Sequence, residues 1–354
     1  MDDLSAPEKE GISQALADRA RDASPPPAYD PRVRRRARWR GMAFVSSLVL
    51  VVTAVAVAVV MTLPIEGRSP HTPASPDSSP FLISGELVFT RGGESIQTVT
   101  LPDGVVTDAA GGDVETIDLE VSPDGTLVAY AVGRGPYEGE LRILDLNTGE
   151  SESIVKDEGT IIGPTWTADG NRIAFIAQSY EQDPSIPVFR IGFVSPDGSR
   201  RNFVDEPATG AVGLAVSPDG SRLVYVDGAH SDVLMLDLGT GESSTLWSRK
   251  EGGAANTVAL SPDGGRLAVV ANGGLYLVPI DQPEAVQPVE TGLGIFDVTW
   301  MSEGQGLILS AEETLEGDAD LYAFDLTAGS PIPLPSTSED DLQPSIAVPA
   351  SEDP

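Results

Sequence analysis

The chain has 354 residues, of which 40 % are hydrophobic, so it is long enough to bury a sizeable core in one or two domains. Its net charge of −32 argues against nucleic-acid binding, because proteins that contact the phosphate backbone present a basic face. Without cysteine it can form neither disulfides nor thiolate zinc sites, and two histidines, His71 and His230, are too few for a multi-histidine metal site.

Residues 1–41 form a leading segment whose charge differs from that of the rest of the chain. They carry nine Lys and Arg against seven Asp and Glu, whereas residues 42–354 carry 13 against 47. Ile12 and Leu16 allow a short helix within this segment, but one turn of apolar contact does not fold alone. We therefore predict a largely disordered tail that has room for one short helix.

Residues 42–63, MAFVSSLVLVVTAVAVAVVMTL, predict a single transmembrane helix. The run has no charged residue and is long enough to span a hydrocarbon core of about 30 Å. Six arginines precede it between residues 32 and 40, whereas Arg68 alone follows it closely. The positive-inside rule then predicts a single-pass plasma-membrane protein with a cytoplasmic N-terminus. A cleaved signal peptide is the competing interpretation, which the long leading segment disfavours.

Residues 64–82 are expected to form a tether outside the membrane. The stretch GRSPHTPASPDSSP within it holds four prolines and four serines, a composition typical of semi-extended linkers. The tether leads into a predicted extracytoplasmic domain, residues 83–349, and the last residues, 350–354, are expected to be disordered.

The domain contains a repeat built on a Ser-Pro-Asp-Gly turn. The copies VSPDGTLVAY, VSPDGSRLVY and LSPDGGRLAV begin at Val121, Val216 and Leu260. These four residues suit the four positions of a type I turn, and apolar residues alternate on either side of it. Each copy is therefore predicted to be two antiparallel strands joined by a tight turn.

The turn carboxylate recurs every 40 to 50 residues, at Asp124, Asp169, Asp219, Asp263 and Glu303. A second strand pair follows each copy, as in LRILDLNTGESESIV, so each unit holds four strands in about 45 residues. That is the size of a β-propeller blade. The similar stretch VSPDGSRRNF, from Val194, is out of phase, and we interpret it as the second turn of its own blade.

The two ends of the repeat region complement each other. The stretch from Gly85 resembles the last three strands of a blade, and DLQPSIAVP, from Asp341, resembles a first strand. Five whole blades and one shared blade predict an all-β fold. It is a six-bladed β-propeller closed by N- and C-terminal strands in one blade and preceded by the single transmembrane helix, which leaves no open edge in the ring.

These repeats resemble the TolB-type propeller repeats, also described as WD40-like or PD40 repeats, over residues 83–349. The resemblance implies a disc-shaped propeller that binds proteins or peptides at its faces. It does not extend to residues 1–82, because TolB-type proteins carry an α/β domain where this chain has a tail, an apolar run and a tether.

Signals for catalysis are poor, and we predict no enzyme, no catalytic residues and no cofactor. A Ser-His-Asp triad would need His230, which lies beside Ser231 and near Asp227 and Asp232. Neighbours on one loop do not converge as the members of a triad do. We therefore interpret His230 as a surface residue.

Signals for metal binding are equally poor, and we predict no metal site. Two acidic stretches could hold Ca²⁺ weakly, but neither matches the calcium-binding loop, and we interpret both as solvated loops. They are Glu316, Asp318 and Asp320, and Glu339, Asp340 and Asp341. The repeated turn aspartates are interpreted as turn formers, and Trp166 and Trp300 as residues packed between blades.

The expected function is that of a protein-, peptide- or ligand-binding scaffold at the bacterial cell envelope. A sensor or regulator of transmembrane signalling, similar to membrane-bound anti-sigma factors, is the alternative. Residues 1–41 weigh against it, because they are shorter than a typical anti-sigma domain and lack a zinc motif. An enzyme of unknown class is the second alternative.

The partner is expected on one face of the predicted disc. Loops joining second to third strands, and the connections between blades, share a face in a propeller, and variable loops are where specificity is usually built. Several of them are acidic here, so we predict a basic partner or a cation, with Glu312, Glu313 and Glu316 contributing. The predicted loops of this face include GRGPYEGE from Gly133, QSYEQDPSIP from Gln178, DGAHSD from Asp227 and AEETLEGDAD from Ala311.

Overall fold

A computed structural model describes most of the repeat region. The described residues are 85–101, 104–111, 115–135, 138–156, 158–179, 188–204, 211–227, 231–248, 253–313, 318–337 and 339–347. The predicted tail, transmembrane helix, tether and C-terminal residues 350–354 lie outside them. Among the described residues, no helix is both long and apolar enough to span a bilayer.

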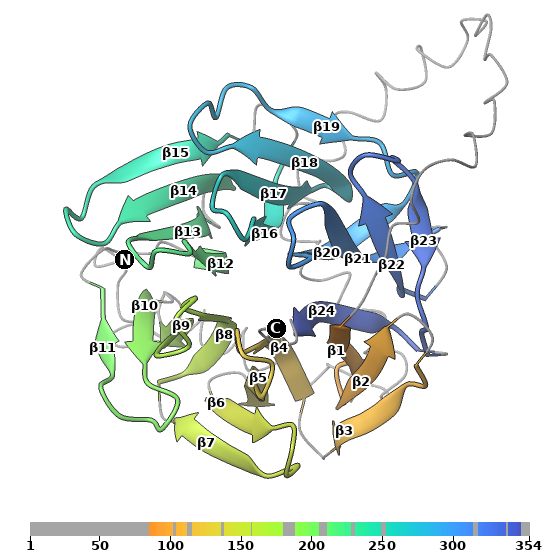
Figure 1. Cartoon of the computed structure of the whole chain (residues 1–354). Coiled ribbons are helices and arrows are strands. Elements are labelled where there is room, and N and C mark those ends of the chain that lie inside the picture. The colour runs from red at the N-terminus through yellow and green to blue at the C-terminus, as the bar shows by residue number, and fades with distance from the viewer. Residues whose placement is uncertain are drawn as a thin grey trace, which may run out of the picture. The chain divides into compact units, whose positions relative to one another are not determined.

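The described strands form six four-stranded antiparallel sheets around a central axis, which confirms the six-bladed propeller (Figure 1). We number them blades 1 to 6 along the chain. Blade 1 orders as β24 (Asp341–Ala347), β1 (Gly85–Arg91), β2 (Ser95–Leu101) and β3 (Thr107–Gly111). Blade 2 contains β4 (Glu115–Val121), β5 (Leu127–Gly135), β6 (Glu138–Asp145) and β7 (Ser151–Val155). Blade 3 contains β8 (Thr160–Trp166), β9 (Ile173–Ser179), β10 (Val188–Val194) and β11 (Asn202–Phe203).

The remaining blades follow the same order from the axis outward. Blade 4 contains β12 (Ala211–Val216), β13 (Arg222–Asp227), β14 (Asp232–Asp237) and β15 (Ser243–Trp247). Blade 5 contains β16 (Ala255–Leu260), β17 (Arg266–Ala271), β18 (Gly274–Pro279) and β19 (Gln287–Val289). Blade 6 contains β20 (Gly294–Trp300), β21 (Gly306–Glu312), β22 (Asp320–Asp325) and β23 (Pro331–Pro333).

The ring closes within blade 1, as the sequence predicts. Strand β24 pairs antiparallel with β1, so that Leu87 lies opposite Ile346 and Thr90 opposite Leu342. Side chains reinforce this pairing, because Thr90 Oγ1 donates to the Gln343 side chain at 2.7 Å. The out-of-phase copy at Val194 is also confirmed as an internal turn, since it joins β10 to β11.

Hydrogen bonds explain why the turn sequence is repeated. In the first copy the Gly125 N–H donates to the Ser122 carbonyl at 2.8 Å, and Gly125 has a φ of 75° that favours glycine. The Asp124 carboxylate accepts from Ser122 Oγ at 2.6 Å and from the Thr126 N–H at 3.1 Å. Asp219 and Asp263 accept the same pair of bonds, so these aspartates form turns as predicted.

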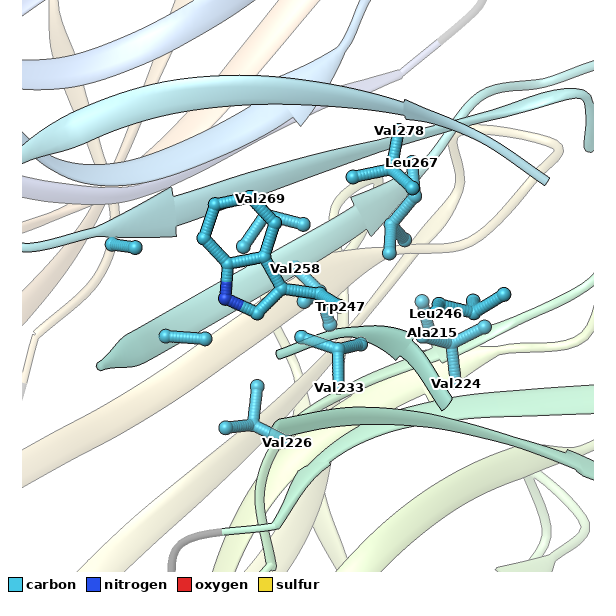
Figure 2. Packing of buried hydrophobic residues seen from close by; sticks show 12 residues of the cluster. Ala215, Val224, Val226, Val233, Leu246, Trp247, Val258, Leu267, Val269 and Val278 are labelled. Carbon is cyan, nitrogen blue, oxygen red and sulfur yellow. The ribbon is translucent and has the colours of Figure 1, made fainter. Parts of the chain in front are cut away.

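The hydrophobic core lies between adjacent blades and not in one central mass. Figure 2 shows the cluster between blades 4 and 5, where the Trp247 ring packs among aliphatic side chains. Trp247 is 1 % exposed, and its ring centroid lies 4.7 Å from that of Tyr276 in the next blade. Similar clusters join the other neighbouring blades, so each blade depends on the next for burial.

The antiparallel order gives the propeller two unlike faces. Turns joining first to second and third to fourth strands lie on one, called the turn face, and the other connections lie on the opposite loop face. Connections on the loop face vary more in length than expected. Strands β5 and β6 extend through most of the predicted loop at Gly133, because their pairing continues to Gly135 and Glu138. Blade 5 has a two-residue turn, Asn272–Gly273, with φ values of 50° and 75°.

Candidate functional site

Negative charge is concentrated in the last two complete blades and the closing strand. Residues 253–347 contain fifteen Asp and Glu but a single basic residue, Arg266. Arg266 lies at the turn face, where its guanidinium donates to the Gly304 carbonyl at 2.6 Å and covers the Trp300 ring. It therefore does not neutralise the carboxylates of the loop face.

A pocket of about 390 Å³ opens among these carboxylates on the loop face of blade 6. Its walls come from the connection between β21 and β22, the start of β22, and the chain from the end of β23 onward. Two carboxylates, those of Glu313 and Asp318, are exposed, and that of Asp320 is half-buried. The lining residues are Glu313, Asp318, Asp320, Leu321, Tyr322, Pro333, Leu334 and Ser336.

The apolar part of the wall is rigidly held. Leu321 and Leu334 are buried, and the Leu334 N–H donates to the Leu321 carbonyl at 2.9 Å. Tyr322 is also buried, and its hydroxyl approaches Glu313 Oε1 at 3.5 Å. Burial and the nearby Glu313 and Asp320 carboxylates raise the Tyr322 pKa, which keeps its hydroxyl protonated as a donor. The pocket therefore combines a fixed apolar wall with carboxylates at its rim.

Carboxylates next to the pocket also have raised pKa values. Burial, with a smaller contribution from Asp320, raises the pKa of Asp341 to about 6, although two bonds from Thr337 and the charge of Arg91 oppose the shift. Burial and then Asp340 raise the pKa of Glu312. In both shifts a neighbouring carboxylate adds to the larger effect of burial, so negative charges lie close together beside the pocket.

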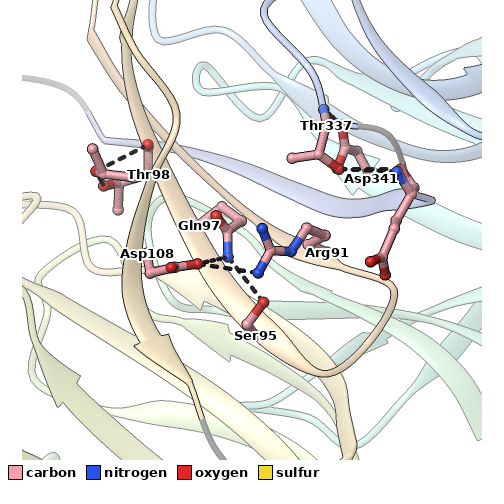
Figure 3. Close-up of polar contacts among 9 residues, drawn as sticks. Arg91, Ser95, Gln97, Thr98, Asp108, Thr337 and Asp341 are labelled. Carbon is pink, nitrogen blue, oxygen red and sulfur yellow. Dashed lines mark hydrogen bonds and ion pairs between the residues drawn. The ribbon is translucent and has the colours of Figure 1, made fainter.

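The structure gathers some of the predicted acidic residues and separates others. Glu313, Asp318 and Asp320 share the pocket, Glu312 adjoins it and Glu316 lies outside the described residues. Asp341 was expected in a solvated loop, but it is fully buried at the start of β24. Thr337 explains that burial, because its N–H and Oγ1 each donate to the Asp341 carboxylate at 2.6 Å (Figure 3).

Three further carboxylates near the axis were not singled out from the sequence. Asp118 and Glu120 on β4, and Asp297 on β20, lie on innermost strands. Burial first, and then the charge of Asp297, raises the pKa of Asp118 to about 8. Burial also raises the pKa values of Glu120 and Asp297, to about 7 and about 6.

These axial carboxylates hold blades together. Asp118 Oδ2 accepts from the Gly163 N–H of the next blade at 3.1 Å, and Asp297 Oδ1 accepts from Thr257 Oγ1 of the preceding blade at 3.1 Å. A signal for them was present in the repeat. Asp118, Gly163, Thr257 and Asp297 all stand four residues before the first residue of their turns.

Only some of the residues weighed for catalysis or metal binding lie in the described chain. His230 lies outside it, and the backbone N–H of Ser231 donates to the Asp227 carbonyl at 2.6 Å. No group of three or more His, Asp or Glu side chains that the structure describes could hold a metal ion.

Comparison with solved structures supports the fold. A chain of a nidogen/laminin complex aligns with a TM-score of 0.61 at 17 % identity, covering 74 % of this chain and 98 % of that one. TolB from Acinetobacter baumannii aligns with a TM-score of 0.62 at 16 % identity, covering 74 % and 66 %. A putative TolB from Agrobacterium tumefaciens gives 0.54 at 14 % identity, covering 73 % and 90 %. No family model matches the chain, and no curated protein matches its sequence.

Proposed function

We propose that the chain is a membrane-anchored, extracytoplasmic scaffold that binds a basic segment of a protein partner in the acidic pocket of blade 6. The observation that carries this proposal is the pocket itself. It places Glu313, Asp318 and Asp320 beside an apolar wall, in a part of the chain with fifteen carboxylates and one arginine. A lysine or arginine side chain supplies both the opposite charge and an aliphatic stem for such a pocket.

The fold supports a protein partner. TolB-like propellers share the architecture, and one propeller of the same fold was solved in a nidogen/laminin complex. Because the rim carboxylates are exposed, salt should screen much of the attraction and weaken binding. Affinity should therefore fall steadily as ionic strength rises.

Anchoring rests on the apolar run at residues 42–63 and the arginines before it. The chain contains no cysteine, so a single introduced cysteine reports its own location. In intact cells or spheroplasts, an impermeant maleimide should label Ser336→Cys but not Ser13→Cys. Labelling of Ser13→Cys alone would place the propeller in the cytoplasm.

The same cysteines test the binding face. A photoactivatable cross-linker on Ser336→Cys, at the pocket, should capture the partner. The matched variant Ser302→Cys places the cross-linker in the exposed turn of the same blade on the opposite face. Capture should disappear when Glu313, Asp318 and Asp320 are neutralised. Equal capture from both positions, or capture that survives neutralisation, would contradict binding in the pocket.

A further inference from the structure

The lip of the acidic pocket, residues 318–320, is hydrogen-bonded directly to the start of the closing strand. Ala319 lies between the pocket residues Asp318 and Asp320 and is 2 % exposed. Its N–H donates to Asp340 Oδ1 at 2.9 Å, and its carbonyl accepts from the Asp341 N–H at 2.8 Å. A change at the lip therefore reaches Asp340 and Asp341 directly, through two hydrogen bonds.

The same two residues fasten blade 6 to blade 1. The Asp341 carbonyl accepts from Ser310 Oγ of β21 at 2.7 Å, and Ser310 is fully buried. The Asp340 carbonyl accepts from the Gly92 N–H, next to β1, at 2.7 Å. Strand β24 begins its pairing with β1 at Asp341 itself, which lies opposite Arg91. The pocket lip, the blade junction and ring closure thus share one set of bonds.

Repulsion between like charges destabilises this junction. Asp320 acts unfavourably on the ionised form of Asp341, and Asp340 does so on Glu312. Arg91 partly offsets the charge of Asp341, but its guanidinium also pairs with Asp108 at 3.3 Å (Figure 3). A cation in the pocket would reduce the repulsion across the lip. The electrostatic cost of closure is therefore lowest when the pocket is occupied.

We infer that occupation of the pocket by a cationic partner and docking of β24 are coupled, so that the partner tightens the closed ring. The inference rests on the function proposed above. The closing strand has two states in this scheme, one with β24 paired with β1 and one with β24 released. The partner prefers the paired state because only there do Asp340 and Asp341 hold the pocket lip in place. By reciprocity, a change outside the pocket lining that favours docking of β24 in turn strengthens binding.

Amide hydrogen exchange of residues 341–347 in the full-length chain tests this coupling. Without ligand, Asp320→Asn removes a like charge that acts on Asp341 and should slow exchange about twofold or more. The matched variant Asp281→Asn, an exposed residue on the turn face of blade 5, should leave the exchange unchanged. Unaltered exchange in Asp320→Asn would overturn the coupling, whatever the pocket binds.

Hexalysine then serves as the probe of the loaded state. It should bind the full-length chain and slow exchange of residues 341–347. In Asp340→Ala, which cuts the bond to Ala319 but leaves the pocket lining intact, it should bind without slowing that exchange. Binding to the unmodified chain with no effect on β24 would overturn the coupling and leave the proposed function standing. Failure to bind would count against the proposed function, and the ligand-free comparison would still decide the coupling.

Discussion

Trp166 donates two hydrogen bonds to Glu120 of the preceding blade. Its backbone N–H reaches the Glu120 carboxylate at 2.8 Å, and its indole Nε1 reaches the Glu120 carbonyl at 3.0 Å. Trp300 repeats the indole bond, at 2.9 Å, to the Ala259 carbonyl of its own preceding blade. Both tryptophans are thus packed between blades, as expected, and each fixes the offset of one blade against the next.

Removing the indole donor should loosen one blade interface at a time. Trp166→Phe keeps most of the apolar contact but leaves the partly buried Glu120 carbonyl without its indole partner. We expect a loss of about 1–2 kcal/mol in the free energy of unfolding, measured by urea titration. Trp300→Phe should behave alike because its contact is equivalent. An unchanged free energy of unfolding in both variants would show that these bonds do not stabilise the interfaces.

The axial carboxylates predict how stability depends on pH. Asp118 has a folded pKa of about 8, well above its ordinary value near 4, so the folded state binds more protons than the unfolded state between those values. Stability should therefore fall as pH rises from about 4 to about 8 and level off above. Urea titrations at pH 5 and pH 8 measure the difference.

Asp118→Asn provides the control for that dependence, because the amide is neutral at every pH. The side chain is half-buried, so we expect the variant to reduce the difference between pH 5 and pH 8 by only about 1–2 kcal/mol. Asp169→Asn should not alter it, since the Asp169 pKa of about 2 lies below this range. An equal pH dependence in Asp118→Asn and the unmodified chain would refute the assignment to Asp118.

The turn aspartates should affect stability more than binding. Asp263→Ala removes the acceptor for Ser261 Oγ and for the Gly265 N–H, whereas Asp263→Asn keeps an acceptor oxygen. The alanine variant should melt several degrees lower and the asparagine variant closer to the unmodified chain, as followed by circular dichroism. Identical melting of the two would mean that the carboxylate bonds are not needed for the turn.

Ring closure predicts a large effect at the C-terminal end. Truncation after Pro335 removes β24 and exposes the edge of β1, so we expect a markedly lower melting temperature and aggregation. Leu342→Ala is a milder probe, because Leu342 is 6 % exposed, and should cost about 2–4 kcal/mol. Melting of the truncated chain at an unchanged temperature would show that β24 does not hold the ring together.

The blades were predictable because their turns repeat as whole sequence segments, whereas contacts between blades recur only at scattered single positions such as Asp118 and Asp297. The copies at Val121, Val216 and Leu260 set the period, and the stretches at Gly85 and Asp341 showed how the ends join. The burial of Asp118 could not be seen in the same way. In an alternating strand a carboxylate resembles a solvated residue, and one of the two N–H groups that make its partial burial tolerable, that of Gly163, belongs to the next blade.

The acidic site was predictable in character but not in shape. The Ala311 loop indicated charge on the loop face, yet Asp318 and Asp320 form a pocket only because Leu334 and Ser336 come alongside after another strand. Asp341 was expected in a solvated loop, and its burial depends on Thr337 folding back onto it. Such contacts arise from the packing of one segment on another and leave no local pattern in the sequence.

The affinity of the captured partner for two matched triple variants tests the central claim most directly. One variant neutralises the pocket with Glu313→Gln, Asp318→Asn and Asp320→Asn. The other neutralises three carboxylates of the turn face with Asp124→Asn, Asp219→Asn and Asp263→Asn. Measured at low salt on folded protein, the pocket variant should bind at least about tenfold more weakly and lose most of its salt dependence, while the turn-face variant binds normally. Full binding by the pocket variant, with weakened binding by the turn-face variant, would contradict the proposed site.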